Sequence, residues 1–270
     1  MNRPEIIDFA AAGGSPARTA ARAQWLADAR ADHSPIVRVP DELAPATAED
    51  AFDTQHETLR RLKYGIGGWK VGAKSPDAPA QGAPLPDALL YASPARLHFE
   101  AHAPFALELE IAFRLGRTFE ASHAPYAERD VMAAIESMCA TIEVVTSRFA
   151  AWPDVDRLWQ LADLQNHGAL IAGAPVPYRD DFPFTAPSLR FTYNGASVFG
   201  SEPANPAGDP RRLLTWVVNH STGRGIALAA GAVITTGSFI GMWSAREPGV
   251  AVGEIEGLPP VQVQFDGAAR

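Results

Sequence analysis

Two glutamates stand two positions apart in FALELEIAFRLG, where Glu108 and Glu110 alternate with aliphatic residues. Side chains alternate between the two faces of a strand, so both carboxylates would share one face while the aliphatic side chains pack on the other. Two carboxylates this close repel each other unless water solvates them, a proton neutralises one or a cation bridges them. The pattern leaves two interpretations open: a solvated strand face, or a site for a hard divalent cation such as Mg²⁺ or Mn²⁺.

A third acidic residue, Glu143, stands alone among apolar residues in CATIEVVTSRF. Its neighbours make solvent exposure an unfavourable explanation for it. Added to Glu108 and Glu110, it would complete a facial set of three carboxylates with open positions for substrate and water.

The elements that must position these acids change character along the chain. SPARTAARAQWLADARADH predicts a helix over Pro16–Arg30, and a second helix is predicted from Ala48 until Gly65 stops it. Two more helical stretches are predicted within residues 128–145 and 210–225. Strand patterns bounded by Gly, Pro or Asn-Gly fill much of the remainder: GWKVGAK, FALELEIAFRLG, SLRFTYNGASVFG, AVITTGSFIG, VAVGEIEG and VQVQF. Helices followed by a β-rich body with inserted helices predict an α+β fold.

Composition narrows the classes of partner. The chain has 270 residues, a formal net charge of −8 and a single cysteine. An acidic chain of this kind offers no electrostatic footprint for nucleic acid or for an anionic membrane, so a small molecule or a protein is the expected partner. The first 35 residues show no uninterrupted apolar run that would make a secretory signal or a membrane span, and we expect a cytoplasmic protein. Cys139 is interpreted as a small core residue.

The segment YGIGGWKVGAKSPDAP places four glycines around Lys70. The glycines follow a charged helical stretch rather than a buried strand, so they do not form a dinucleotide fingerprint. A phosphate-binding P-loop also requires Ser or Thr after its lysine, and Val71 stands there. From residue types alone, Lys70 is a surface lysine at a turn.

Six segments taken in order carry a resemblance: GGWKVGAKS, ALELEIAFRLG, ATIEVVTSRF, LADLQNHGALIAG, YNGASVFG and LAAGAVITTGSFIG. They resemble the 2-keto-4-pentenoate hydratase and 4-oxalocrotonate decarboxylase family, a branch of the fumarylacetoacetate hydrolase superfamily. The resemblance covers roughly residues 48–265. It implies a helical N-terminal region, residues 1–64, followed by a single compact body, residues 65–270, that carries the superfamily's rolled mixed β-sheet. It also implies a homo-oligomer.

The resemblance implies roles for individual residues. The family's metal-binding acids fall on Glu108, Glu110 and Glu143, and its Gly-Trp-Lys-Val-Gly lysine falls on Lys70, which would then face the substrate. Asp87, in LPDALL, corresponds to the family's acidic residue after that lysine, and would be its partner in general acid–base steps. A lysine that is partly desolvated beside a cation is expected to have a lowered pKa. Backbone and side-chain contacts to the substrate carboxylate are expected from the segment Gly237, Ser238 and Phe239.

The implied activity is a hydro-lyase reaction that uses Mg²⁺ or Mn²⁺. Water would add to a 2-hydroxy-2,4-dienoate, a 2-oxo-4-enoate in its keto form, to give a 4-hydroxy-2-oxo acid in the degradation of aromatic compounds. A decarboxylase of the 4-oxalocrotonate type and a C–C hydrolase are the alternatives within the superfamily, the latter requiring a His-Glu pair for which His33 and Glu42 are candidates. A non-catalytic binding partner is the alternative from another class. Association with a sister decarboxylase or hydratase is also implied.

One segment departs from the family pattern. Where relatives carry an Asp-Asn-Ala-Ser type of sequence, this chain reads Asp163-Leu164-Gln165-Asn166-His167. Asp163 keeps the family position and is expected to order the loop. His167 is interpreted either as a substrate contact or as a structural histidine.

Overall fold

The computed structural model describes residues 15–102, 104–198 and 202–267. Both N-terminal helices begin where the sequence predicts, and the helix predicted within residues 210–225 is also present. The α-helices are α1 (Pro16–Asp32), α2 (Ala48–Leu62), α3 (Phe99–His102), α4 (Glu128–Met132), α5 (Arg157–Ala162) and α6 (Arg212–Gly223). Short 3₁₀ helices are η1 (Asp41–Leu43), η2 (Asp87–Leu89) and η3 (Leu164–Asn166).

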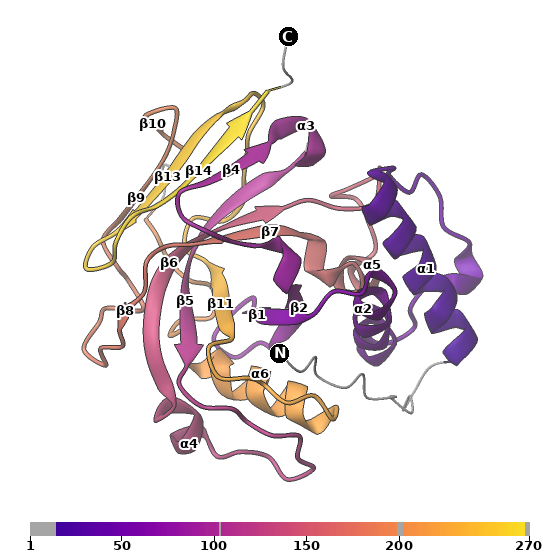
Figure 1. Cartoon of the computed structure of the whole chain (residues 1–270), viewed down its shortest axis with the longest axis horizontal. Helices are drawn as coiled ribbons and strands as arrows, with labels where there is room; N and C mark the ends of the chain where they lie inside the picture. The colour runs from indigo at the N-terminus through magenta and orange to yellow at the C-terminus, as the bar shows by residue number, and fades with distance from the viewer. Residues whose placement is uncertain (1–14, 103, 199–201, 268–270) are drawn as a thin grey trace.

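The strands form two sheets (Figure 1). The larger one has nine strands in the order β2-β1-β11-β5-β6-β7-β3, with β12 added beside β5 and β8 beside β6. It is mixed, because β1 runs parallel to β11 and β3 parallel to β7. Its strands are β1 (Ile66–Gly72), β2 (Gln81–Pro86), β3 (Leu90–Ala92), β5 (Ala106–Leu115), β6 (Ile135–Val145), β7 (His167–Ala172), β8 (Val176–Pro177), β11 (Val233–Ser238) and β12 (Trp243–Ser244).

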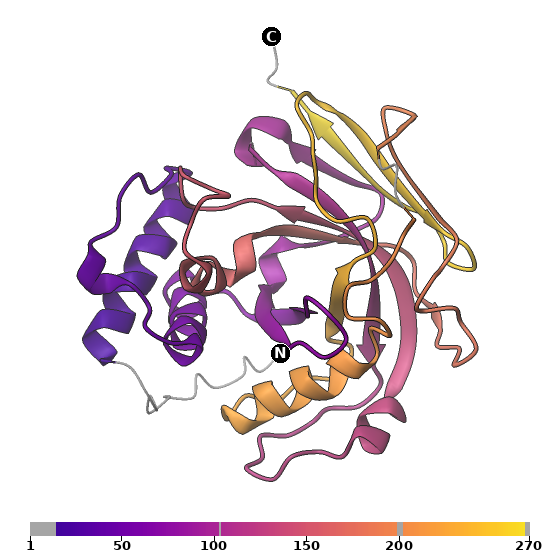
Figure 2. The same cartoon turned by 180° about the vertical axis from the view of Figure 1, so that it is seen from behind.

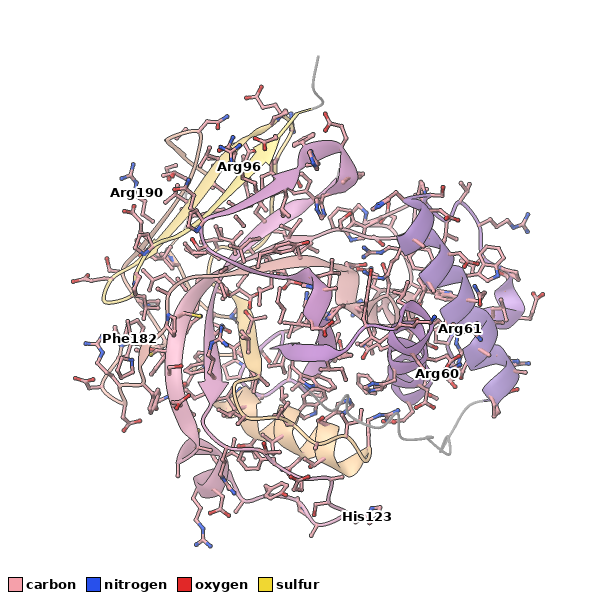
Figure 3. The ribbon with its side chains drawn as sticks, viewed as in Figure 1. Arg60, Arg61, Arg96, His123, Phe182 and Arg190 are labelled. Atoms are coloured by element: carbon pink, nitrogen blue, oxygen red, sulfur yellow. The ribbon has the colours of Figure 1, made fainter. Side chains whose placement is uncertain are left out.

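The smaller sheet has five strands in the order β10-β9-β13-β14-β4. They are β4 (Ala95–His98), β9 (Leu189–Tyr193), β10 (Ala196–Ser197), β13 (Gly249–Ile255) and β14 (Val261–Asp266). Figure 3 shows Arg96 and Arg190 on this sheet, on the side away from the large sheet. They lie beside Asp266 and Glu254, so the outer face of this sheet is solvated.

The main apolar core lies between the two sheets, and one face of β5 packs against it. Leu107, Leu109 and Ile111 join the main apolar cluster, and Leu109 approaches Gly253 of the small sheet. Since side chains alternate, Glu108 and Glu110 lie on the face of β5 opposite to these core residues. The alternation predicted for this strand is confirmed.

The N-terminal helices form a second, smaller apolar cluster with α5. Leu26 of α1 and Phe52 of α2 share it with Trp159 of α5, a helix inserted between β6 and β7. Figure 2 shows α1, α2 and α5 side by side, next to the edge of the large sheet. The helical region therefore packs on the segment just before β7. The division of the chain at residues 64 and 65 stays a prediction.

The helix predicted within residues 128–145 is largely wrong. Only Glu128–Met132 is helical, and Ile135–Val145 is the long strand β6. A strand buried on both faces has a continuous apolar sequence, which periodicity cannot distinguish from a buried helix. Residues Ile142, Val144 and Val145 are β-branched and favour the strand. In the part of the chain that the structure describes, no helix has the length and apolar character needed to cross a membrane.

Candidate metal centre

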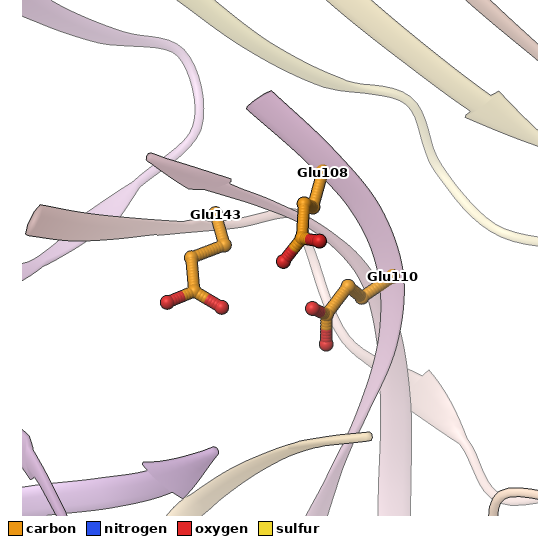
Figure 4. A group of neighbouring side chains, drawn as sticks. All are labelled: Glu108, Glu110 and Glu143. Carbon is orange, nitrogen blue, oxygen red and sulfur yellow. The ribbon is translucent and has the colours of Figure 1, made fainter. Parts of the chain in front are cut away.

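The three predicted acids meet on one face of the large sheet. Glu108 of β5 is paired in register with Glu143 of β6, and Glu110 lies two positions further along β5. Their side chains converge in Figure 4, and one ligand atom from each lies within 4.8 Å of the others. The strand register therefore brings together residues that are separated by more than thirty positions in the sequence. Glu143 joins the set because its segment is a strand and not a helix.

Glu110 is held in place by backbone and hydroxyl donors. Its Oε2 accepts a hydrogen bond of 2.8 Å from the Gly237 N–H and another from the Thr235 hydroxyl. Gly237 has a φ of +93°, and the register of β11 against β5 shifts between Thr235 and Ser238. A glycine adopts this backbone conformation without the steric penalty that a side chain would incur. The bulge thus turns the Gly237 N–H toward the carboxylate.

The two carboxylate oxygens of Glu143 have different surroundings. Oε1 lies 2.6 Å from Lys70 Nζ and 3.0 Å from His167 Nδ1. Oε2 is buried, and the described residues offer it no hydrogen-bond partner. Burial alone would raise the pKa of Glu143, but Lys70 and His167 outweigh it and hold this pKa below its ordinary value. The free oxygen of a buried carboxylate is an acceptor that a cation would satisfy.

Burial and mutual repulsion disfavour a negative charge on Glu108 and Glu110. Burial and then the neighbouring carboxylates raise the pKa of Glu108 well above its usual range, and burial and Glu143 raise the pKa of Glu110 to about 7. Three converging carboxylates suit a hard divalent cation such as Mg²⁺, Mn²⁺ or Ca²⁺. The residues present therefore fit a divalent metal, and the solvated strand face is the poorer interpretation.

Lys70 lies on β1 and reaches across to Glu143. Gly68 lets this strand approach β11 closely, because a Cβ at position 68 would stand 2.2 Å from the Val233 carbonyl oxygen. Lys70 Nζ also donates a hydrogen bond of 3.2 Å to the Gln165 carbonyl. The side chain of Lys70 is 12% exposed, so it is a nearly buried site residue and not a surface lysine at a turn.

The carboxylates around Lys70 raise its pKa, and the lowering expected beside a bound cation stays a prediction. Burial alone would lower this pKa, but the Glu143, Glu108 and Glu110 carboxylates raise it above its usual value. The expected lowering depended on a cation beside the lysine, whereas carboxylates surround the ammonium here. Lys70 is protonated at neutral pH in this arrangement.

The segment from Asp163 to His167, which departs from the family pattern, forms a turn beside the candidate metal centre. Leu164, Gln165 and Asn166 all have left-handed backbone angles, with φ of 52°, 50° and 58°. Asp163, before them, is buried and accepts hydrogen bonds from Arg148 and Arg30, which agrees with its expected role in ordering the loop. Sequence reasoning missed the Gln165 carbonyl and both arginines. The unusual Asp-Leu-Gln-Asn-His sequence was the only signal, and it did not show which atoms would act.

His167 lies at the start of β7 and is fully buried. Burial lowers its pKa more than Glu143 raises it, so the ring is neutral. A carboxylate oxygen only accepts, hence Nδ1 carries the hydrogen and Nε2 is left as an acceptor. Among the residues that the structure describes, Nε2 has no hydrogen-bond partner. As a structural histidine, His167 orients the Glu143 carboxylate. A contact between His167 and the substrate stays a prediction.

Asp87 is not brought to Lys70 by this structure. In the β1–β2 pairing Ala83 stands opposite Lys70, whereas Pro86 stands opposite Ile66, four residues back along β1. Asp87 follows Pro86, is exposed, and accepts a hydrogen bond of 3.1 Å from the Gly65 N–H. Four strand residues span roughly 13 Å. Its role as the acid–base partner of Lys70 stays a prediction.

The Gly237–Phe239 segment is partly committed to other contacts. Gly237 donates to Glu110, as described above, and the Ser238 hydroxyl donates to the Gly241 carbonyl at 2.9 Å. Phe239 is 2% exposed and belongs to the main apolar core. Contact of this segment with a substrate carboxylate stays a prediction.

Comparison with known proteins places this fold and site in a family. Residues 72–264 match the model of the fumarylacetoacetate (FAA) hydrolase C-terminal family. The chain belongs to this family and is an enzyme of the fumarylacetoacetate hydrolase superfamily. The resemblance seen in the sequence is therefore confirmed, and so is the rolled mixed-sheet fold.

Individual relatives are hydratases by name. The chain is 29% identical over 255 residues to 2-keto-4-pentenoate hydratase 2 of Dechloromonas aromatica (strain RCB), covering 91% of this chain and 96% of that protein. It is 26% identical over 158 residues to 2-hydroxyhexa-2,4-dienoate hydratase of Comamonas testosteroni, covering 58% and 59% of the two chains. In fold it is similar to 4-oxalocrotonate decarboxylase from Pseudomonas putida G7, complexed with magnesium and adipate, with a TM-score of 0.81 at 21% identity over 94% of this chain and 99% of that one.

Proposed function

We propose that the protein is a hydratase dependent on Mg²⁺ or Mn²⁺ that adds water to a 2-hydroxy-2,4-dienoate and forms a 4-hydroxy-2-oxo acid, as a step in the degradation of aromatic compounds. The observation that carries the proposal is the triad of Glu108, Glu110 and Glu143, of which the last two are buried, with Lys70 2.6 Å from Glu143. The names of the two hydratase relatives support this choice of reaction.

The three glutamates would hold the metal. A divalent cation bound there supplies positive charge that polarises the carboxylate and the C2 oxygen of a 2-oxo acid and favours proton transfers on the adjacent carbons. Gly237 and Thr235 keep Glu110 oriented, and His167 and Lys70 keep Glu143 ionised. The protein thus prepares the donor set before any substrate arrives.

Lys70 is the proton carrier in this proposal. Over the whole reaction the water oxygen bonds to C4, one proton reaches C5, and the enol proton at the C2 oxygen moves to C3. Lys70 Nζ would give a proton to C5 and recover one from the water that adds at C4. Glu143 and the Gln165 carbonyl fix the position of Nζ during these transfers. Asp87 is kept as the predicted partner of Lys70.

The same three glutamates would also suit a carboxy-lyase. In that reaction a vinylogous β-keto acid loses CO₂, and a bound cation would stabilise the negative charge that develops. The experiment must therefore separate the two outcomes. We would follow the ultraviolet absorbance of 2-hydroxypenta-2,4-dienoate with added Mg²⁺ or Mn²⁺ and identify the products by mass. Metal-free protein and the Lys70→Ala and Asp87→Asn variants serve as comparisons.

A metal-dependent gain of one water, lost in Lys70→Ala, is the expected result. Full activity in Lys70→Ala would contradict the role of the lysine, and full activity in Asp87→Asn would remove Asp87 from the mechanism. Loss of CO₂ from a 2-oxo-3-enedioate, without hydration of the dienoate, would assign the carboxy-lyase instead. Metal binding without turnover of either compound would favour the non-catalytic partner.

A further inference from the structure

One buried arginine of the N-terminal helix α1 reaches the turn beside the metal centre. Arg30 Nη2 donates to the Asp163 carbonyl at 3.1 Å and to the Asp163 carboxylate at 2.8 Å, while Nη1 donates to the His167 carbonyl at 3.1 Å. The side chain of Arg30 is 8% exposed. A single guanidinium therefore binds both ends of the segment between residues 163 and 167.

That segment supplies two contacts to the site. The Gln165 carbonyl accepts from Lys70 Nζ, and the His167 ring is hydrogen-bonded to Glu143. Between Asp163 and His167 the backbone takes three successive left-handed conformations at non-glycine residues, each of which is unfavourable unless the surroundings impose it. The hydrogen bonds from Arg30 to Asp163 and to the His167 carbonyl hold the two ends of this turn.

We propose that Arg30 is a positioning residue of the active site, which sets the Gln165 carbonyl against Lys70 and the His167 ring against Glu143 by binding both ends of the turn. The N-terminal helices lie outside the residues matched by the family model, which begin at 72. The proposal gives α1 a part in the site. It rests on the proposed function only where turnover is measured.

The chemistry of the contact requires arginine. A planar guanidinium directs several N–H donors to separate acceptors, here two carbonyls and a carboxylate, whereas a lysine ammonium is a compact charge without this fork. Burial is the main cause that lowers the pKa of Arg30, to about 10, so it stays charged at neutral pH. Asp163 forms ion pairs with both Arg30, at 2.8 Å, and Arg148, at 2.9 Å.

The chain offers a matched control on the same helix. Arg22 is also buried, with its side chain 2% exposed, but its partners are Thr19, Thr54 and Asp50 in α1 and α2. Substitution of Arg22 removes a buried arginine without touching the turn. We would compare Arg30→Met, Arg30→Lys and Arg22→Met in the full chain by thermal unfolding, by Mn²⁺ affinity from electron paramagnetic resonance, and by kcat and KM with the dienoate.

We expect Arg30→Met to weaken Mn²⁺ binding about tenfold and to lower kcat about 10- to 100-fold, as outer residues that orient ligands and catalytic groups commonly do. Arg30→Lys should fall between Arg30→Met and the wild type. Arg22→Met should lower the unfolding temperature while Mn²⁺ affinity and kcat of the folded protein stay within about twofold of the wild type.

The proposal is overturned if Arg30→Met and Arg22→Met lose the same thermal stability and neither changes Mn²⁺ affinity or kcat. If Arg30→Met does not fold, Arg30→Lys decides, and wild-type values of Mn²⁺ affinity and kcat in that variant would be a negative answer. If the wild-type protein binds Mn²⁺ but does not convert the dienoate, the proposed function fails, and the Mn²⁺ comparison still tests Arg30.

Discussion

Glu143 connects the candidate metal centre to Lys70. One of its oxygens binds Lys70 and His167, and the other is buried without a protein donor. Removing its charge would leave the lysine ammonium facing a neutral amide and would deprive a cation of one ligand. A metal bound at the candidate centre and Lys70 would therefore both depend on this one side chain.

We predict that Glu143→Gln weakens binding of Mg²⁺ and Mn²⁺ by at least about tenfold, because hard cations prefer charged oxygen ligands and the amide keeps only one oxygen. Isothermal titration calorimetry on metal-free protein measures this directly. Glu128→Gln, on the exposed helix α4, serves as the control for loss of one negative charge and should bind as the wild type does. Equal affinities in both variants would rule out Glu143 as a ligand.

Strand β1 shows how an element positions a residue through its glycines. A Cβ at Gly68 would stand 2.2 Å from the Val233 carbonyl oxygen of β11, whereas a Cβ at Gly72 would meet nothing within 4 Å. Backbone atoms cannot yield as a flexible side chain can. The close approach of β1 to β11 also places Lys70 opposite Thr235, next to the residues that hold Glu110.

Gly68→Ala is predicted to lower the free energy of unfolding by about 1–3 kcal/mol, the usual cost of overpacking, and to reduce kcat by displacing Lys70. Gly72→Ala, on the same strand, should change the free energy of unfolding by less than about 0.5 kcal/mol. Urea unfolding of both variants, followed by fluorescence, provides the measurement. Similar midpoints for the two variants would mean that β1 can move away from β11 at little cost.

At the scale of the whole molecule, helices α2 and α6 enclose Trp69 of β1 between two histidines. The His220 ring stacks on Trp216 with centroids 4.5 Å apart and meets Trp69 edge-on at 5.5 Å, while His56 lies 6.1 Å from Trp69. Burial, followed by the charge of Arg224, lowers the pKa of each histidine to about 3. The folded protein therefore keeps both rings neutral.

This arrangement predicts an acid-sensitive fold. The unfolded chain binds a proton at each histidine below about pH 6.5 and the folded chain does not, so stability is complete above that pH and falls as the pH decreases toward 3. Between pH 6.5 and pH 5 the loss amounts to at most about 2 kcal/mol for each histidine. His220→Phe keeps the aromatic contacts and should flatten the pH dependence of the unfolding free energy. An unchanged slope would exclude His220 as a source.

Much of the site was predictable from local pattern. The Glu-x-Glu spacing places Glu108 and Glu110 on one face of any strand that contains them, and the lone Glu143 in an apolar segment marks a buried acid. The strands GWKVGAK and VQVQF and the helix that begins at Pro16 were also predictable, because their periods and end signals are local properties of the chain.

Only the tertiary structure decided the rest. Residues 135–145 form a strand because both of their faces are covered, and coverage depends on segments far away in the sequence. The contacts of Lys70 with the Gln165 carbonyl and of Arg30 with the turn join residues 95 and more than 130 positions apart. A backbone carbonyl has no sequence signature, and long-range pairing is set by packing. The sequence by itself determined which groups could do chemistry, and the fold determined which of them meet.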